Sequence, residues 1–108
     1  MTRRASIDFS RVANSALASS VSICQRWLPN GRLEGREWVA LNPKRDDPWM
    51  GSFKINVATG RWSDFNLGAR GGDLISLAAY LFDIDQAEAA RRLARMIGVS
   101  PYVRFRSF

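Results

Sequence analysis

The segment from residue 52 to residue 65 constrains the fold of this chain more than any other stretch. Its first half, "SFKINV", alternates polar and apolar residues, the letters "ATG" make a turn, and "RWSDF" returns. A period of two places apolar side chains on one face of a strand, and a short connection with glycine favours an antiparallel hairpin. The segment therefore predicts a β-hairpin in which Phe53, Ile55 and Val57 face a core. Lys54 then points to the opposite face.

Helical patterns lie on both sides of this hairpin. Apolar residues recur at three- and four-residue steps across residues 8–28, which predicts an amphipathic helix that ends at the "PNG" turn. Asp73 precedes a second apolar run and is placed to cap a helix. Asp85, with Glu88 three residues later, resembles a capping box for a last helix that ends at Gly98.

These elements predict an α+β fold. A short extended run at 37–41 precedes the hairpin, so we expect a small antiparallel sheet in a core spanning about residues 35–73. One N-terminal helix and two C-terminal helices, over about residues 73–98, flank it. A length of 108 residues with 46% hydrophobic residues supports a single domain spanning residues 1–108.

The sequence has no segment typical of a membrane or secreted protein. No apolar run approaches the roughly 20 residues that span a bilayer, and "MTRRASIDFSRV" lacks the apolar core of a signal peptide. We therefore expect a soluble, cytoplasmic protein with no membrane partner.

The numbers of His and Cys residues limit the chemistry that this chain can perform. It contains no His and one Cys, Cys24, which lies in a helical apolar pattern. This composition excludes Ser-His-Asp and Cys-His catalysis within the chain, excludes an intrachain disulfide, and leaves zinc at most one thiolate. Asp46 and Asp47 are adjacent and Asp64 is distant in sequence, which does not suit paired-metal chemistry. We expect no catalytic residue, no cofactor and no small-molecule substrate.

The charge of the chain points to an acidic partner, most simply nucleic acid. The net charge is +6, and 14 of the 16 basic residues are Arg. Arg favours bidentate phosphate contacts and stacking on bases, although a GC-rich genome produces the same bias. Single strands are bound by basic grooves and aromatic faces. The residues that bring both groups to the hairpin and its loops are Lys44, Arg45, Trp49, Lys54, Arg61, Trp62 and Arg70.

Several of these features have a structural interpretation as well. Trp62 on a short strand also fits a core position, and Trp49 is either a loop anchor or a base contact. The glycine-rich turn at 68–72 could cradle a phosphate at a helix N-terminus, but the Asp73 carboxylate competes for the same N–H groups. The last helix carries a basic run that suits either solvent or a DNA backbone: Arg91, Arg92 and Arg95.

The order of these motifs resembles a known family. "LNPKRDDPWMGSFKINVATGRWSDFNLGARGGDLISLAAYL" and the tail "DQAEAARRLARMIGV" carry a Pro, a Ser-Phe strand, a hairpin, an aromatic, a Gly and a Gly-Asp before an apolar helix. Over about residues 35–99 the chain resembles the N-terminal zinc-ribbon domain of bacterial and phage DNA primases. The family's four zinc-ligand positions fall on Asn42, Arg45, Asp64 and Leu67. The chain looks like a metal-free relative of the kind found in phage, plasmid and integrative-element primase or primase-helicase proteins.

The resemblance implies a binding module rather than an enzyme. The family's zinc domain helps a separate catalytic domain to engage single-stranded template. The resemblance therefore implies a non-catalytic module that binds single-stranded DNA and acts with a primase catalytic domain or a helicase. The alternative is a protein-interaction module that docks such a replication partner and does not bind DNA itself.

The lost ligand positions raise a structural question. In a zinc ribbon the metal connects the loop before the hairpin to the ligand-bearing turn after it, which is called the knuckle. Without zinc ligands, these two loops need another connection here. Arg45 and Asp64 have complementary charges and come from opposite loops. We expect a charged hydrogen bond between them, with Asn42 nearby and Leu67 adding apolar packing. The alternative is that Arg45 and Asp64 are exposed and unpaired.

Overall fold

The predicted hairpin forms the centre of the sheet. The computed structural model describes residues 6–45 and 51–104, and within them β3 (Phe53–Asn56) pairs antiparallel with β4 (Trp62–Asp64). Ile55 lies opposite Trp62, and Lys54 lies opposite Ser63. Gly60 has a φ of 81°, in the left-handed region that glycine adopts without strain, at the end of the turn between the two strands.

Three further strands complete a five-stranded antiparallel sheet in the order β1-β2-β3-β4-β5. The added strands are β1 (Arg32–Glu34), β2 (Glu37–Ala40) and β5 (Ala69–Gly71). The expected extended run at 37–41 is β2, and the predicted α+β class is confirmed. The sequence pattern missed the two edge strands. All three residues of β1 are exposed, so β1 has no alternation, and β5 lies inside the glycine-rich stretch that was interpreted as a turn.

The N-terminal helix expected over residues 8–28 is divided into α1 (Phe9–Leu17) and α2 (Ser20–Trp27). The periodicity of apolar residues continues through the break, so the pattern alone did not reveal it. Ser19 leaves the helical conformation, and its N–H donates to the Ala16 carbonyl three residues back. The Ser20 hydroxyl donates to the Val57 carbonyl at 2.6 Å, which fixes the start of α2 against the end of β3.

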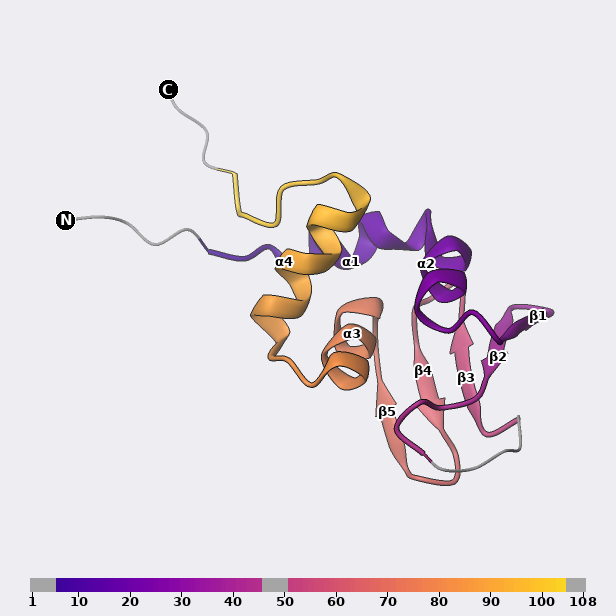
Figure 1. Cartoon of the computed structure of the whole chain (residues 1–108). Coiled ribbons are helices and arrows are strands. Elements are labelled where there is room, and N and C mark those ends of the chain that lie inside the picture. Colours follow the sequence, from indigo (N-terminus) through magenta and orange to yellow (C-terminus); the bar gives the residue numbers. More distant parts are fainter. Residues whose placement is uncertain (1–5, 46–50, 105–108) are drawn as a thin grey trace.

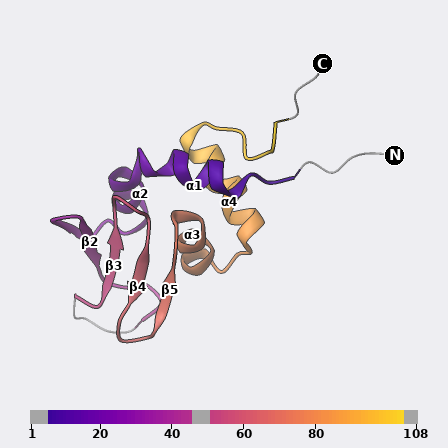
Figure 2. The ribbon, with the colours of Figure 1, turned by 180° about the vertical axis from the view of Figure 1, so that it is seen from behind.

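The two C-terminal helices have the predicted ends. Asp73 caps α3 (Leu74–Phe82) in a reciprocal capping box with Ser76. The Asp85 side chain accepts from the Glu88 N–H at 2.7 Å and caps α4 (Gln86–Ile97), which ends at Gly98 with a φ of 77°. In Figures 1 and 2, α3 lies beside the β5 edge of the sheet, and β1 and β2 lie at the far edge.

The sheet has one face in the core, and its other face is open over β3, β4 and β5, whereas Val39 of β2 on that face is buried. Directly paired residues share a face, so Trp38, Ile55 and Trp62 form one row, and all three are buried in the same core cluster. The neighbouring row, on the opposite face, contains Lys54 and Arg70, which are exposed. Within residues 6–45 and 51–104, no helix has the length and apolar character to cross a bilayer.

Candidate nucleic-acid interface

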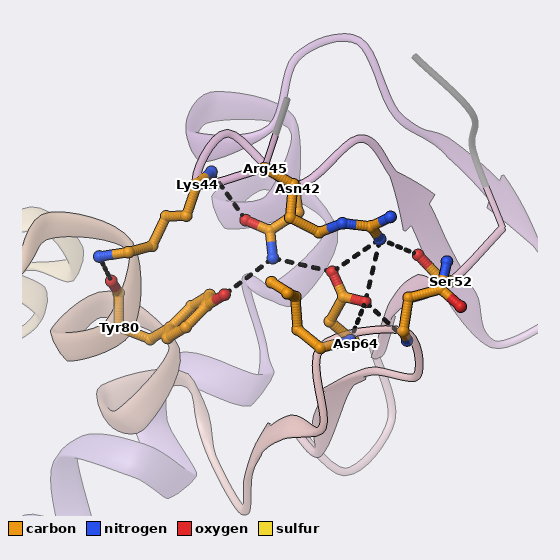
Figure 3. Close-up of polar contacts among 8 residues, drawn as sticks. Asn42, Lys44, Arg45, Ser52, Asp64 and Tyr80 are labelled. Atoms are coloured by element: carbon orange, nitrogen blue, oxygen red, sulfur yellow. Dashed lines mark hydrogen bonds and ion pairs between the residues drawn. The ribbon is translucent and has the colours of Figure 1, made fainter. Parts of the chain in front are cut away.

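The expected contact between Arg45 and Asp64 is present and buried (Figure 3). Arg45 Nη1 donates to Asp64 Oδ1 at 3.1 Å and to Oδ2 at 3.3 Å, and it also donates to the Ser52 hydroxyl at 2.6 Å. The Asp64 side chain is completely inaccessible, and the Arg45 side chain is 12% exposed. The ion pair therefore joins the loop before β3 to the end of β4.

Asn42 extends this ion pair into a buried polar network. Its Nδ2 donates to Asp64 Oδ2 at 2.9 Å and to the Tyr80 hydroxyl of α3 at 2.9 Å. Its Oδ1 accepts from the Lys44 N–H at 2.9 Å. In the part of the chain that the structure describes, no buried side-chain nitrogen or oxygen lacks a hydrogen-bond partner. The buried charge is therefore compensated, and the loops are connected to a helix of the core.

These contacts set the ionisation of Asp64. Burial by itself raises the pKa of the Asp64 carboxyl. Hydrogen bonds from Asn42, Arg45 and the Leu67 N–H, together with the positive charge of Arg45, outweigh burial and hold the pKa below its usual value. Asp64 is accordingly a stable anion at neutral pH.

The residues at the family's ligand positions do not fit zinc. Structural zinc sites use thiolates and imidazoles, whereas the side chains here are an amide, a guanidinium, a carboxylate and an alkyl group. The Arg45 guanidinium already supplies positive charge to the Asp64 carboxylate. Across the described ranges 6–45 and 51–104, no group of three or more His, Cys, Asp or Glu side chains is placed to hold a metal.

Leu67 does not play the part that the sequence suggested. Its side chain is 53% exposed, so the expectation that it packs in place of a thiolate is wrong. The contribution of Leu67 comes from its backbone, whose N–H donates to Asp64 Oδ1 at 3.3 Å, beside the Asn66 N–H at 3.0 Å. The knuckle turn is therefore organised around the carboxylate by backbone donors rather than by apolar packing.

The open face of the sheet carries a row of free cations. Lys54, Ser63 and Arg70 are direct cross-strand neighbours on β3, β4 and β5. With Arg61, the two cations line a shallow hollow of about 820 Å³, to which Glu37 contributes an acidic side chain. Among the described residues, Lys54, Arg61 and Arg70 form no ion pair. The hollow thus brings together four of the seven residues that the sequence singled out, Lys54, Arg61, Arg70 and the largely buried Trp62, and their binding to nucleic acid stays a prediction.

Phe65 is an aromatic on this face that the sequence interpretation did not select. It is 87% exposed, and it follows Ser63 by two residues, so both side chains lie on the open side of β4. Phe65 lines a second hollow of about 430 Å³, and Lys54 and Ser63 line both hollows. Asp64 pairs with the buried Phe53, so position 65 falls on the opposite face. The sequence gives little sign of this, because Ser63 and Asp64 are both polar and Phe65 is apolar.

Other predicted contact residues lie elsewhere. Trp62 borders the larger hollow but is only 5% exposed, and its Nε1 donates to the Ser76 hydroxyl at 2.9 Å. Its burial supports the core interpretation, and a base contact at Trp62 stays a prediction. Arg45 is committed to Asp64, and the Lys44 ammonium contacts Asp83 and the Tyr80 carbonyl. The predicted contact at Trp49 lies outside the described residues.

The helix features that suggested phosphate binding have structural roles. The Asp73 carboxylate accepts from the Ser76 N–H at 2.8 Å, so it occupies the N-terminus of α3 where a phosphate would bind. On α4, Arg91 and Arg92 both pair with Glu88, at 3.0 Å in each case. These contacts favour the cap at α3 and a solvated face at α4.

Comparison with known proteins adds a structural likeness. No family model and no curated protein matches this chain. A similar solved structure is the crystal structure of the Aquifex aeolicus primase, comprising zinc-binding and RNA polymerase domains, with 24% sequence identity and a TM-score of 0.73. The likeness covers 88% of this chain and 22% of that primase chain, so this chain corresponds to about a fifth of its length. The chain therefore has a primase zinc-ribbon-like fold.

Proposed function

We propose that this chain is a non-catalytic module that binds single-stranded DNA template in a primase or primase-helicase system. The observation that carries the proposal is the open sheet face, where Lys54 and Arg70 flank Ser63 and an exposed Phe65 lies beside them. A basic surface that includes an aromatic face is the combination that single strands require. The primase-like fold supports the placement of the module in DNA priming.

The distance between neighbouring β-strands suggests how a bound DNA strand would lie across the sheet. Adjacent strands are about 4.8 Å apart, so the backbones that carry Lys54 and Arg70 are separated by about 10 Å. That distance favours separate phosphate contacts over a shared one. The two hollows adjoin at Lys54 and Ser63, so a chain that contacts these cations can continue toward Phe65. A base stacked there would supply an attraction that does not depend on sequence.

The proposed role leaves nucleotide transfer to another domain. The buried Asp64 carboxylate is already paired with Arg45 and has a structural role. The hollow on the open face is lined by cations rather than by the acidic cluster that holds metal ions in nucleotide transfer. The partner in this proposal is a primase catalytic domain or a helicase that receives the bound template. In the alternative, the chain docks such a partner without contacting DNA, and the experiment below separates the two.

The test is a titration of a fluorescent single-stranded oligonucleotide at several salt concentrations. Each phosphate contact contributes roughly 0.7 to the slope of log affinity against log salt, so Lys54→Ala/Arg70→Ala should lower that slope by about 1.4. Phe65→Ala should weaken binding by about 1–3 kcal/mol at every salt concentration, because it removes stacking. The Phe65 N–H bond to the Ser52 carbonyl involves only the backbone and is retained in this variant.

Matched controls lie on the helical side of the molecule. Arg26 and Arg95 are exposed cations, and Phe82 is an aromatic that is 47% exposed. Arg26→Ala/Arg95→Ala and Phe82→Ala should leave DNA affinity and its salt slope close to wild type. If the test and control variants lose DNA affinity equally, the binding depends only on the net charge of the chain and not on the open sheet face. If the wild-type chain binds no single strand at low salt, the interaction-module alternative replaces the proposal.

A further inference from the structure

A groove lies between α2, α3 and α4, on elements that the proposed DNA contact does not use. Its volume is about 610 Å³, and Trp27, Phe82, Ile84 and Met96 are among the side chains that line it. The rings of Trp27 and Phe82 meet edge to face with centroids 5.7 Å apart, and Phe82 is nevertheless 47% exposed. An adjoining hollow of about 350 Å³ shares Arg26 and Met96, so the groove continues along α2 and α4. We call these two hollows the helical groove.

The rim of the helical groove is basic. Arg26 of α2 and Arg92 and Arg95 of α4 line it, and among the described residues no Asp or Glu does. Arg92 is held by Glu88 on its own helix. Within residues 6–45 and 51–104, neither Arg26 nor Arg95 forms an ion pair, and both are exposed. Two free cations from different helices therefore border an apolar and aromatic floor.

We propose that the helical groove docks an acidic amphipathic helix of a partner protein. Such a helix places apolar anchors at i, i+3 or i+4, and i+7, which is the mode in which helices enter apolar grooves. Its acidic flanks would meet Arg26 and Arg95. The unbranched Met96 side chain at the junction of the two hollows can adapt to anchors of different shape. This surface is separate from the Lys54 row, so a partner and a DNA strand can bind at the same time.

Charge and chemistry distinguish this occupant from three others. The segments "MTRRA" and "FRSF" contain Arg and no Asp or Glu, so they lack the acidic side chains that the rim favours. A second copy of the chain carries a net charge of +6 and is disfavoured because the basic rim would repel it. A nucleic acid could use the cations and stack a base on Phe82, but the aliphatic floor of Ile84, Leu93 and Met96 suits the apolar anchors of a helix better than phosphates or sugars, and the test below includes DNA as a competitor.

The test uses a fluorescein-labelled synthetic peptide of about 15 residues, with Leu and Phe on one helical face and Glu on the other. Two further peptides serve as controls: one of the same composition with its apolar residues scattered, and one with Lys in place of Glu. The intact chain should bind the amphipathic acidic peptide at least about tenfold more tightly than either control peptide.

Variants then locate the site. Arg26→Glu/Arg95→Glu should weaken peptide binding at least about tenfold and leave single-strand affinity unchanged. Phe82→Ala should also weaken peptide binding, at every salt concentration. Lys54→Glu/Arg70→Glu changes the net charge equally and should leave peptide binding intact. Circular dichroism and thermal melting of each variant confirm that the fold is retained.

Four outcomes would overturn the proposal. They are no preference for the amphipathic peptide, equal losses in the two double variants, displacement of the peptide by single-stranded DNA, and self-association in sedimentation that Arg26→Glu/Arg95→Glu abolishes. Displacement by DNA would make the helical groove a nucleic-acid surface. Self-association of that kind would make it an interface between copies of this chain.

Discussion

Arg45 Nη1 lies 3.1 Å from Asp64 Oδ1, joining two loops whose counterparts in zinc ribbons are tied by a metal. Asp64 is completely buried and Arg45 nearly so. The net contribution of a buried ion pair is often small, because desolvation offsets the attraction. The removal of one partner is costly, however, because the other charge is left buried and uncompensated. The pair thus fixes the arrangement of the loops more than it adds stability.

The first prediction is that Arg45 and Asp64 are energetically coupled. Arg45→Ala and Asp64→Ala should each lower the free energy of unfolding by about 3–5 kcal/mol, because each leaves a partner unpaired. The double variant should lose less than the sum, with a coupling energy of about 0.5–3 kcal/mol in denaturant unfolding. The exposed pair Arg32 and Glu34 is the control, and its cycle should be close to additive. Additive losses for Arg45 and Asp64 would refute the coupling.

The second prediction concerns acid stability. The pKa of Asp64 is lower in the folded chain than in the unfolded chain, where an ordinary Asp has a pKa of about 3.9. The folded state therefore holds fewer protons, and the stabilisation is present above about pH 4 and lost as pH falls through the folded pKa. The difference in unfolding free energy between wild type and Asp64→Asn should shrink below about pH 4. Denaturant titrations across pH 2–7 measure it, and a constant difference would contradict the assignment.

How much the sequence predicted can be argued from these same residues. The contact between Arg45 and Asp64 could be predicted because the surrounding motif fixed both positions and their charges are complementary. Leu67 was misjudged because its residue type suggested packing, whereas its turn uses the backbone N–H. Whether Leu67 contributes through its side chain or its backbone depends on the geometry of the turn, which the residue type alone does not determine.

The strands follow a similar rule. The alternation that predicted β3 exists because one face of that strand is buried, and β1 has no such pattern because all its residues are exposed. Beside the break between α1 and α2, the Ser20 hydroxyl donates a hydrogen bond to the carbonyl of Val57, which is distant in sequence. Neither feature leaves a periodic signal in the local sequence. Phe65 gave no such signal either, because its apolar type suggests the core and the adjacent Ser63 and Asp64 interrupt the alternation.

The third prediction compares two adjacent glycines. A Cβ added at Gly71 would collide with the indole of Trp62, its cross-strand partner, and with the Ser76 hydroxyl, whereas Gly72 has open space at that position. Gly71→Ala should destabilise the chain by about 1–3 kcal/mol through overpacking. Gly72→Ala should be close to neutral or slightly stabilising. Thermal melting compares the two, and equal effects would show that Trp62 does not require the close approach.

The fourth prediction concerns the thiol. Burial raises the pKa of Cys24 to about 12, so the folded chain presents a protonated, inaccessible thiol at neutral pH. Because the thiolate is the reactive form, a chromogenic disulfide reagent at pH 8 should react only slowly with native protein. In denaturant the same thiol should react at the rate of an unstructured cysteine. Rapid reaction of the native chain would mean that α2 opens readily or that Cys24 is not buried.

The final prediction is that the lost metal site can be rebuilt. The wild-type chain should melt at the same temperature with and without a chelator, because it has no His and a single, buried Cys. Replacing the residues at the four corresponding positions should create a tetrahedral thiolate and imidazole site: Asn42→Cys, Arg45→His, Asp64→Cys and Leu67→Cys.

The rebuilt variant should bind one zinc ion per chain by elemental analysis, and a chelator should lower its melting temperature, because zinc binding is coupled to folding. A variant that keeps Leu67 and changes only the other three positions should bind zinc more weakly. Comparable binding by both variants would show that Leu67 does not correspond to a ligand position. If the four-residue variant binds no zinc, the correspondence between these loops and a zinc ribbon is wrong, even though the fold is shared. Zinc in the unaltered chain would instead show that the Arg45 and Asp64 pair does not replace a metal.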